Sequence, residues 1–181
     1  MRINLKEKYE NEVVPDLIRD FNYKNLHEVP KITKIQINRG LGLSAQNSSI
    51  LKSTIDEIRL ISGQQPIITK SKKSIAGFKL REEQNIGVTV TLRKKKMYSF
   101  LEKLIHLTLP RIRDFRGLPL SCFDQKGNYN FGLKDQLVFP EITYESVDQT
   151  RGFNISIITT SKTKEEGLAL FRKIGLPLVN N

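Results

Sequence analysis

The sequence has very little of what holds a secreted or metal-dependent protein together. Cys122 is the only cysteine among 181 residues, so no intrachain disulfide can form and a reducing compartment is expected. This cysteine and the two histidines are scattered and give no metal-ligand spacing. No apolar run approaches the roughly 18–20 residues of a membrane-spanning helix. We therefore predict no disulfide framework, no metal or cofactor site and no membrane span.

The first twelve residues also lack a targeting pattern. They carry charges of both signs, without an apolar signal core and without the Arg- and Ser-rich, acid-poor composition of a transit peptide. We expect the chain to be made in the compartment where it works, or to be shown here already processed.

Positive charge is what the chain has in excess. It contains 30 Lys and Arg against 19 Asp and Glu, which gives a net charge of +11 and a pI near 9.8. Such an excess indicates a polyanionic partner: nucleic acid first, and an anionic membrane surface second. The length and the hydrophobic content of 38% suit one core, so a single domain is predicted over residues 1–181.

The densest cationic stretch follows a Gly turn and Pro66, and we predict a basic loop at residues 70–85. Small residues and one aromatic, Phe78, lie among its cations, and no acid occurs before Glu82. Cations release the counterions of a phosphate backbone, and an aromatic ring can stack on a base. An ordinary solvated loop is the alternative. The cations of the loop are Lys70, Lys72, Lys73, Lys79 and Arg81.

A second basic patch opens a long excursion at residues 111–152, which contains only weak strand signals such as 137–139 and a turn signal at Gly127-Asn128. The patch is either a solvated helix end in a favourable dipole position or a phosphate contact, and we favour the contact. Its residues are Arg111, Arg113 and Arg116.

Hydrophobic periodicity predicts an α+β protein. The economical architecture has two layers, a largely antiparallel sheet with helices packed on one face and the other face open for RNA. Pro15 should kink or divide the first helix. Helices are predicted over 5–21, from a cap at 47–49 to about 61, over 97–108 and over 164–174, and strands over 31–39, 67–69, 86–93 and 153–160.

The open face should be polar and cationic. Ile35 and Ile37 alternate with polar residues along the first strand, and successive side chains of a strand point to opposite faces. The strand at 86–93 alternates in the same way. The predicted outward residues are Lys34, Gln36, Asn38, Thr89, Thr91 and Arg93.

The segment from Gly40 to Ala45 matches G-x-G-x-x-A between a strand and a helix, which leaves a nucleotide-dependent enzyme as the alternative function. The next strand, however, runs into Lys70 instead of the acid that holds a ribose. The first strand also alternates, whereas a doubly covered parallel strand is apolar throughout. His106 and the scattered acids form no evident acid–base pair. We predict no catalytic residue and no small-molecule substrate.

Residues 61–79, which read ISGQQPIITKSKKSIAGFK, resemble the signature of a known family. The chain resembles the universal large-subunit ribosomal protein five family, whose bacterial-type members bind 5S ribosomal RNA. Further segments that look like family blocks are 12–15, 21–23, 34–42, 110–117, 123–129, 139–142 and 151–152.

The resemblance implies an α+β fold without catalysis, placed in the central protuberance of the large subunit. It implies that the loop at 72–81 reaches the transfer RNA in the peptidyl site, and that the excursion bridges to a small-subunit head protein. A stem of the large ribosomal RNA is a further implied partner. The residues implied to face 5S RNA are Lys34, Asn38, Gln64, Phe78 and Thr91.

Residues 94–96, three lysines, depart from the family pattern, either as an added phosphate contact or as drift. The composition, rich in Lys, Asn and Ile, is similar to that of a plastid-encoded copy. The expected location is the chloroplast stroma, with the bacterial cytoplasm as the alternative.

Overall fold

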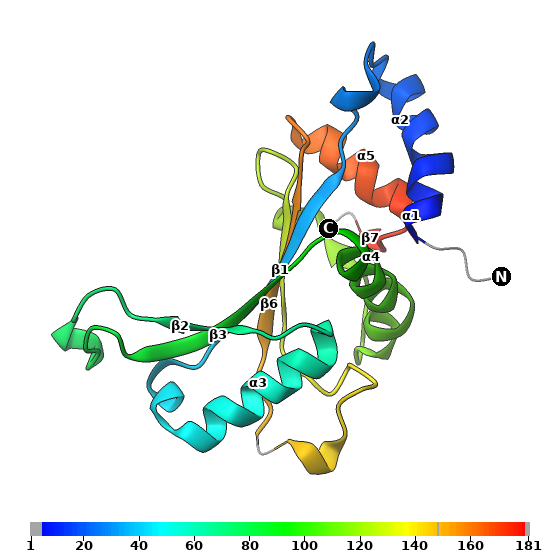
Figure 1. The fold of residues 1–181 in the computed structure, drawn as a ribbon. Helices are drawn as coiled ribbons and strands as arrows, with labels where there is room; N and C mark the ends of the chain where they lie inside the picture. The colour runs from blue at the N-terminus through cyan, green and yellow to red at the C-terminus, as the bar shows by residue number, and fades with distance from the viewer. Residues whose placement is uncertain (1–4, 148, 180–181) are drawn as a thin grey trace. The chain divides into compact units, whose positions relative to one another are not determined.

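The computed structural model describes residues 5–147 and 149–179 (Figure 1). Parts of two predictions, on the N-terminal segment 1–12 and on the excursion 111–152, lie outside the described residues. The α-helices are α1 (Leu5–Lys8), α2 (Val14–Phe21), α3 (Ser48–Ser62), α4 (Lys94–Lys103) and α5 (Lys164–Ile174). The strands are β1 (Ile32–Gly40), β2 (Ile67–Lys70), β3 (Asn85–Leu92), β4 (Leu118–Pro119), β5 (Tyr129–Leu133), β6 (Phe153–Thr159) and β7 (Leu178–Val179).

Five strands form one sheet in the order β2-β3-β1-β6-β5, and β4 pairs with β7 in a second, parallel one. The predicted α+β class with a largely antiparallel sheet is confirmed. None of the described helices has the length and apolar character to cross a membrane.

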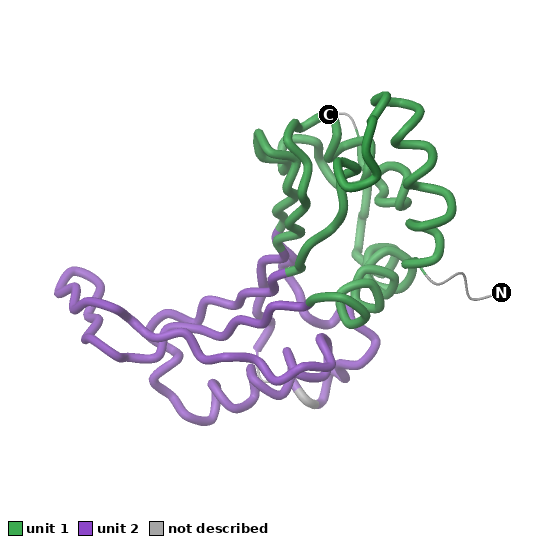
Figure 2. Tube along the Cα trace, turned by 45° about the horizontal axis from the view of Figure 1, so that its top comes forward, with its two compact units in different colours: residues 1–35, 93–131, 156–181 green, residues 36–92, 132–155 purple. Residues whose placement is uncertain are grey.

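The chain divides into two compact units (Figure 2). Unit 1 comprises residues 1–35, 93–131 and 156–181, and unit 2 comprises 36–92 and 132–155. The single domain expected over 1–181 stays a prediction, and each unit is described by itself below.

The predicted helix over 5–21 is divided next to Pro15, as expected. A π-helical turn, Tyr9–Val13, separates α1 from α2. Pro15 occupies the first turn of α2, where its missing N–H leaves no hydrogen bond unmade. Val13 and Leu17 are buried in unit 1. There α2 packs against α5, and Lys173 Nζ lies 2.8 Å from Asp20 Oδ2.

The last two helices follow the sequence closely. α5 begins after Thr163, whose hydroxyl accepts a hydrogen bond from the Glu166 N–H, and it ends at Gly175 in the left-handed region. α4 continues into a π-helical turn, Leu104–Thr108, and a short turn that contains Pro110. Its predicted apolar stripe is buried throughout: Met97, Phe100, Leu101, Leu104, Ile105 and Thr108.

Unit 2 is built on α3 and the strands that it covers. Asn47 caps α3 by accepting from the Ser49 N–H, and Gly63 ends it with φ +63°. Ile58 and Ile61 are buried, and α3 packs against β3. A Cβ at Gly87 of β3 would collide with the Arg39 carbonyl oxygen, so only glycine permits this approach of β3 to β1.

Within its described residues, the excursion contains two short strands, β4 and β5, and otherwise turns. Gly127 has φ +72°, and the Asp124 carboxylate accepts hydrogen bonds from the N–H groups of Lys126 and Asn128. This confirms the predicted turn at Gly127-Asn128. The apolar piece 137–139 is a turn with no strand, because Phe139 is buried against Phe153 instead of pairing along an edge.

Candidate nucleic-acid interface

The outer face of the sheet in unit 2 carries the centre of the predicted site. Ile37, Val88 and Val90 are at most 2% exposed and form the inner face. The residues that follow Ile37 and Val90, Asn38 on β1 and Thr91 on β3, therefore point outward; Asn38 is exposed and Thr91 is half-buried. Strands β1 and β3 are neighbours in the sheet. The structure thus brings these two predicted residues onto one face.

Polar groups on this face fall into two kinds. Gln36 Nε2 donates to Thr89 Oγ1 at 3.4 Å, and the Thr89 hydroxyl donates to the Ile37 carbonyl at 3.1 Å. These groups tie the strands together. The Asn38 carboxamide and the Thr91 hydroxyl, in contrast, have no hydrogen-bond partner among residues 5–147 and 149–179. Their hydrogen-bonding capacity is available to a ligand.

Gln64 has a role that the sequence did not indicate. Its side-chain Nε2 donates to the Thr91 backbone carbonyl at 3.1 Å. The backbone carbonyl of Gln64 accepts from the Ser62 hydroxyl at 3.0 Å. The side chain therefore braces the turn after α3 against the end of β3. Its Oε1 makes no hydrogen bond within the described part of the chain, so this atom is available to a ligand.

The basic loop is an extension of the β2–β3 hairpin, with a helical turn, Ala76–Phe78, at its tip (Figure 1). The backbone N–H of Ser71 donates to the Gln84 carbonyl at 2.8 Å, and Ile75 pairs with Leu80. Phe78 is 68% exposed. The five predicted cations of the loop, Lys70, Lys72, Lys73, Lys79 and Arg81, are all exposed.

The remaining predicted residues belong to unit 1. Lys34 is half-buried on β1, and Arg93 is exposed at the N-cap of α4. Arg113 Nε lies 3.7 Å from Asp114 Oδ2, but both side chains are almost fully exposed, so this pair is weak. Three exposed arginines follow α4 as predicted: Arg111, Arg113 and Arg116. They belong to unit 1, whereas the sheet face that carries Asn38 and Thr91 belongs to unit 2.

The glycines at 40 and 42 do not form a dinucleotide site. Gly42 opens a short 3-10 turn, Gly42–Gln46, that leads from β1 toward α3. The strand after α3 is β2, and β2 pairs with β3 instead of with β1. A dinucleotide fold requires the strands on either side of the helix to be parallel neighbours. Among the described residues, no group of three or more His, Cys, Asp or Glu could hold a metal ion.

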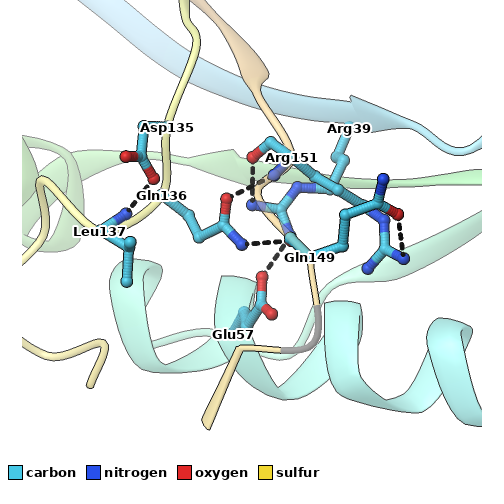
Figure 3. Close-up of polar contacts among 7 residues, drawn as sticks. All are labelled: Arg39, Glu57, Asp135, Gln136, Leu137, Gln149 and Arg151. Carbon is cyan, nitrogen blue, oxygen red and sulfur yellow. Dashed lines mark hydrogen bonds and ion pairs between the residues drawn. The ribbon is translucent and has the colours of Figure 1, made fainter. Parts of the chain in front are cut away.

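A buried polar cluster in unit 2 was missed from the sequence (Figure 3). Arg39 is 0% exposed, forms an ion pair with Glu57 of α3 and donates from Nη2 to the Arg151 carbonyl at 3.3 Å. Its guanidinium carbon lies 5.4 Å from the centre of the Phe153 ring. The strand alternation carried the signal, because Arg39 falls on the same inward face as Ile35 and Ile37.

Gln136 completes this cluster. Its Nε2 donates to the Gln149 carbonyl at 2.9 Å, and its Oε1 accepts from the Arg151 N–H at 2.6 Å (Figure 3). One fully buried side chain therefore closes the base of the loop between 137 and 149. The loop is held on the same strand, β1, whose outer face carries Asn38.

Two family models match consecutive parts of the chain. Residues 25–81 match the family model described as "Ribosomal protein L5", and residues 85–178 match the one described as "ribosomal L5P family C-terminus". The large ribosomal subunit protein uL5c of Heterosigma akashiwo is 67% identical over 177 residues, 98% of each chain. That of Guillardia theta is 59% identical, and uL5 of Trichodesmium erythraeum is 55% identical, both over 100% of each chain.

The two matching family models describe ribosomal proteins, and these relatives are ribosomal proteins too. None of these is an enzyme. This confirms the predicted resemblance and the prediction that the chain has no enzymatic function. At these identities, and with matches over nearly all of its length, the chain belongs to the ribosomal protein L5 family.

Proposed function

We propose that the chain is a structural component of the large ribosomal subunit that binds 5S ribosomal RNA through the outer sheet face of unit 2. The observation that carries this proposal is the pair of unpartnered groups on neighbouring strands, the Asn38 carboxamide and the Thr91 hydroxyl. An amide and a hydroxyl can bond to 2′-hydroxyls and exposed base edges. The internal bonds of Gln36, Thr89 and Gln64 hold both groups in place.

The hairpin tip supports a second RNA contact, with the transfer RNA in the peptidyl site. Its exposed cations suit a phosphate backbone, and the exposed Phe78 ring offers a surface on which a base can stack. In unit 1, Arg93 and the arginines at 111, 113 and 116 suit a stem of the large ribosomal RNA. Such contacts would place the protein in the central protuberance.

The loop between 137 and 149 suits a protein partner. Residues 135–150 contain four acids and no Lys or Arg, so this segment repels RNA while the rest of the chain attracts it. Tyr144 is 82% exposed on it. A basic protein of the small-subunit head, reached across an intersubunit bridge, fits both features. The relatives named uL5c support a plastid ribosome as the location.

A titration with 5S ribosomal RNA, against a transfer RNA at two salt concentrations, tests the main proposal. Specific binding should survive the higher salt, whereas binding by charge alone should not. Asn38→Ala should weaken 5S binding by about 1 kcal/mol, the scale of one hydrogen bond. Lys34→Ala is the comparison, because Lys34 is the cation implied to face the same RNA, and its loss should mainly flatten the salt dependence. Equal, salt-sensitive binding of both RNAs would remove the sheet face as a specific site.

A further inference from the structure

Ile67 is exposed to an unusual degree for a strand residue. It is 70% exposed, more than any other aliphatic residue among the large hydrophobics of the described chain. It lies on β2, the edge strand of the five-stranded sheet. Its neighbour Ile68 is only 36% exposed and pairs with Val88, which is fully buried. Successive residues of a strand face opposite ways, so Ile68 faces the core and Ile67 faces outward.

The pairing register places Ile67 on the same face as the proposed RNA-binding groups. In the antiparallel ladder of β2 and β3, Ile67 is opposite Thr89, and residues directly opposite share a face. Thr89 lies two residues from Thr91 on β3, and its hydroxyl is already bonded to Gln36 and to the Ile37 carbonyl. At this end of the face, a ligand therefore meets aliphatic surface: the Ile67 side chain and the Thr89 methyl group.

The composition of the face indicates which part of an RNA it suits. Among the described residues of unit 2, its members include no aromatic residue, so it offers no ring on which a splayed base could stack. A wide, shallow minor groove of helical RNA presents 2′-hydroxyls, base edges and the carbon surface of riboses. An aliphatic side chain beside free amide and hydroxyl groups is complementary to that surface. On β1, β2 and β3 the face includes Gln36, Asn38, Ile67, Thr69, Thr89 and Thr91.

We propose that Ile67 is a direct RNA contact, which packs against a ribose of helical RNA while Asn38 and Thr91 bond to its polar groups. This inference rests on the proposed function and extends that site to the edge strand. A protein strand added to β2 is the competing explanation of an exposed edge residue. Ile67 favours RNA because its side chain stands on the sheet face with Thr89, whereas an added strand would bond to backbone groups along the edge.

The test compares 5S RNA binding by Ile67→Ala with that by the parent chain, over a series of salt concentrations. Removal of this apolar contact should raise the Kd about fivefold to tenfold. The slope of log Kd against log salt should not change, because no cation is lost. Leu60→Ala is the matched control: Leu60 is also an exposed aliphatic, at 58%, but it lies on α3, and its removal should leave the Kd unchanged. Both variants should melt like the parent.

Three results would overturn the inference. If the parent prefers 5S RNA and Ile67→Ala binds it equally well, Ile67 makes no contact, while the proposed function stands. A flattened salt slope in Ile67→Ala would show that the residue acts through the neighbouring cations instead of through its own surface. If the parent itself binds 5S RNA no better than transfer RNA, the proposed function fails, and the inference fails with it.

Discussion

Loss of the Glu57 charge should be among the most damaging single changes in unit 2. The Arg39 guanidinium is 0% exposed, and Glu57 is 5% exposed, so the two charges neutralise each other out of water. Arginine cannot lose its proton at any ordinary pH. Glu57→Gln therefore leaves a buried cation without a neutralising charge; the introduced amide oxygen, the Arg151 carbonyl and the Phe153 ring are its remaining partners. The expected cost is about 3–5 kcal/mol, a large share of a typical stability of 5–15 kcal/mol.

Removal of the Arg39 charge should cost less stability than removal of the Glu57 charge. Arg39→Met leaves Glu57 without its partner, but a carboxylic acid can take up a proton and become neutral. The double variant Arg39→Met/Glu57→Met should recover most of the loss, because well-packed apolar residues often replace a buried ion pair without cost. Asp56→Asn is the matched control, since Asp56 is an exposed acid beside Glu57 on the same helix. It should change the stability by less than about 0.5 kcal/mol.

Urea denaturation followed by circular dichroism gives these free energies of unfolding. The expected loss for Glu57→Gln corresponds to a fall of about 6–20 °C in Tm for a chain of this size. If the free energy of unfolding of Glu57→Gln is within about 1 kcal/mol of that of the parent, the Arg39 charge must be solvated, and its burial does not make it costly. The same holds if the double variant is no more stable than Glu57→Gln.

Three further changes test local features of unit 1. Thr163→Ala should cost about 1 kcal/mol, because it removes the acceptor for the Glu166 N–H, whereas Thr163→Ser should retain the cap; equal urea midpoints for both variants would contradict this. Lys94→Gly should stabilise the chain by about 0.5–1 kcal/mol, because Lys94 has φ +51°; a loss of stability would show that no strain is relieved. Burial opposes ionisation of Asp124, but hydrogen bonds from Asn128 and from the Lys126 N–H outweigh it and hold its pKa below the ordinary value. A carboxylate with a lowered pKa stabilises the fold above its unfolded pKa, and this is lost as the pH falls through the folded pKa. Asp124→Asn should therefore lower Tm at pH 7 and have a smaller effect near pH 2; an equal effect at both would contradict the assignment.

The sequence alone determined the features that depend on near neighbours. Residues 47–49 and Thr163 mark helix starts, and Gly63 and Gly175 mark helix ends, because capping is decided within one turn of helix; the structure then selects Asn47 from its three candidates. Alternation along β1 and β3 assigned Asn38 and Thr91 to the outward face, because side chains in a strand alternate whatever the rest of the chain does. The family resemblance was also present in the residues themselves.

Only the tertiary structure decided the contacts between distant segments. The register that places Ile67 opposite Thr89, and the bond from Gln64 to the Thr91 carbonyl, depend on how strands pair and how the turn after α3 packs. Arg39 meets Glu57 and Arg151 across 18 and 112 positions of the chain. Local preference carries no information about such pairs, because their energy arises only when burial removes both groups from water. The sequence thus showed which side chains face outward, and the fold showed which of them remain free to bind RNA.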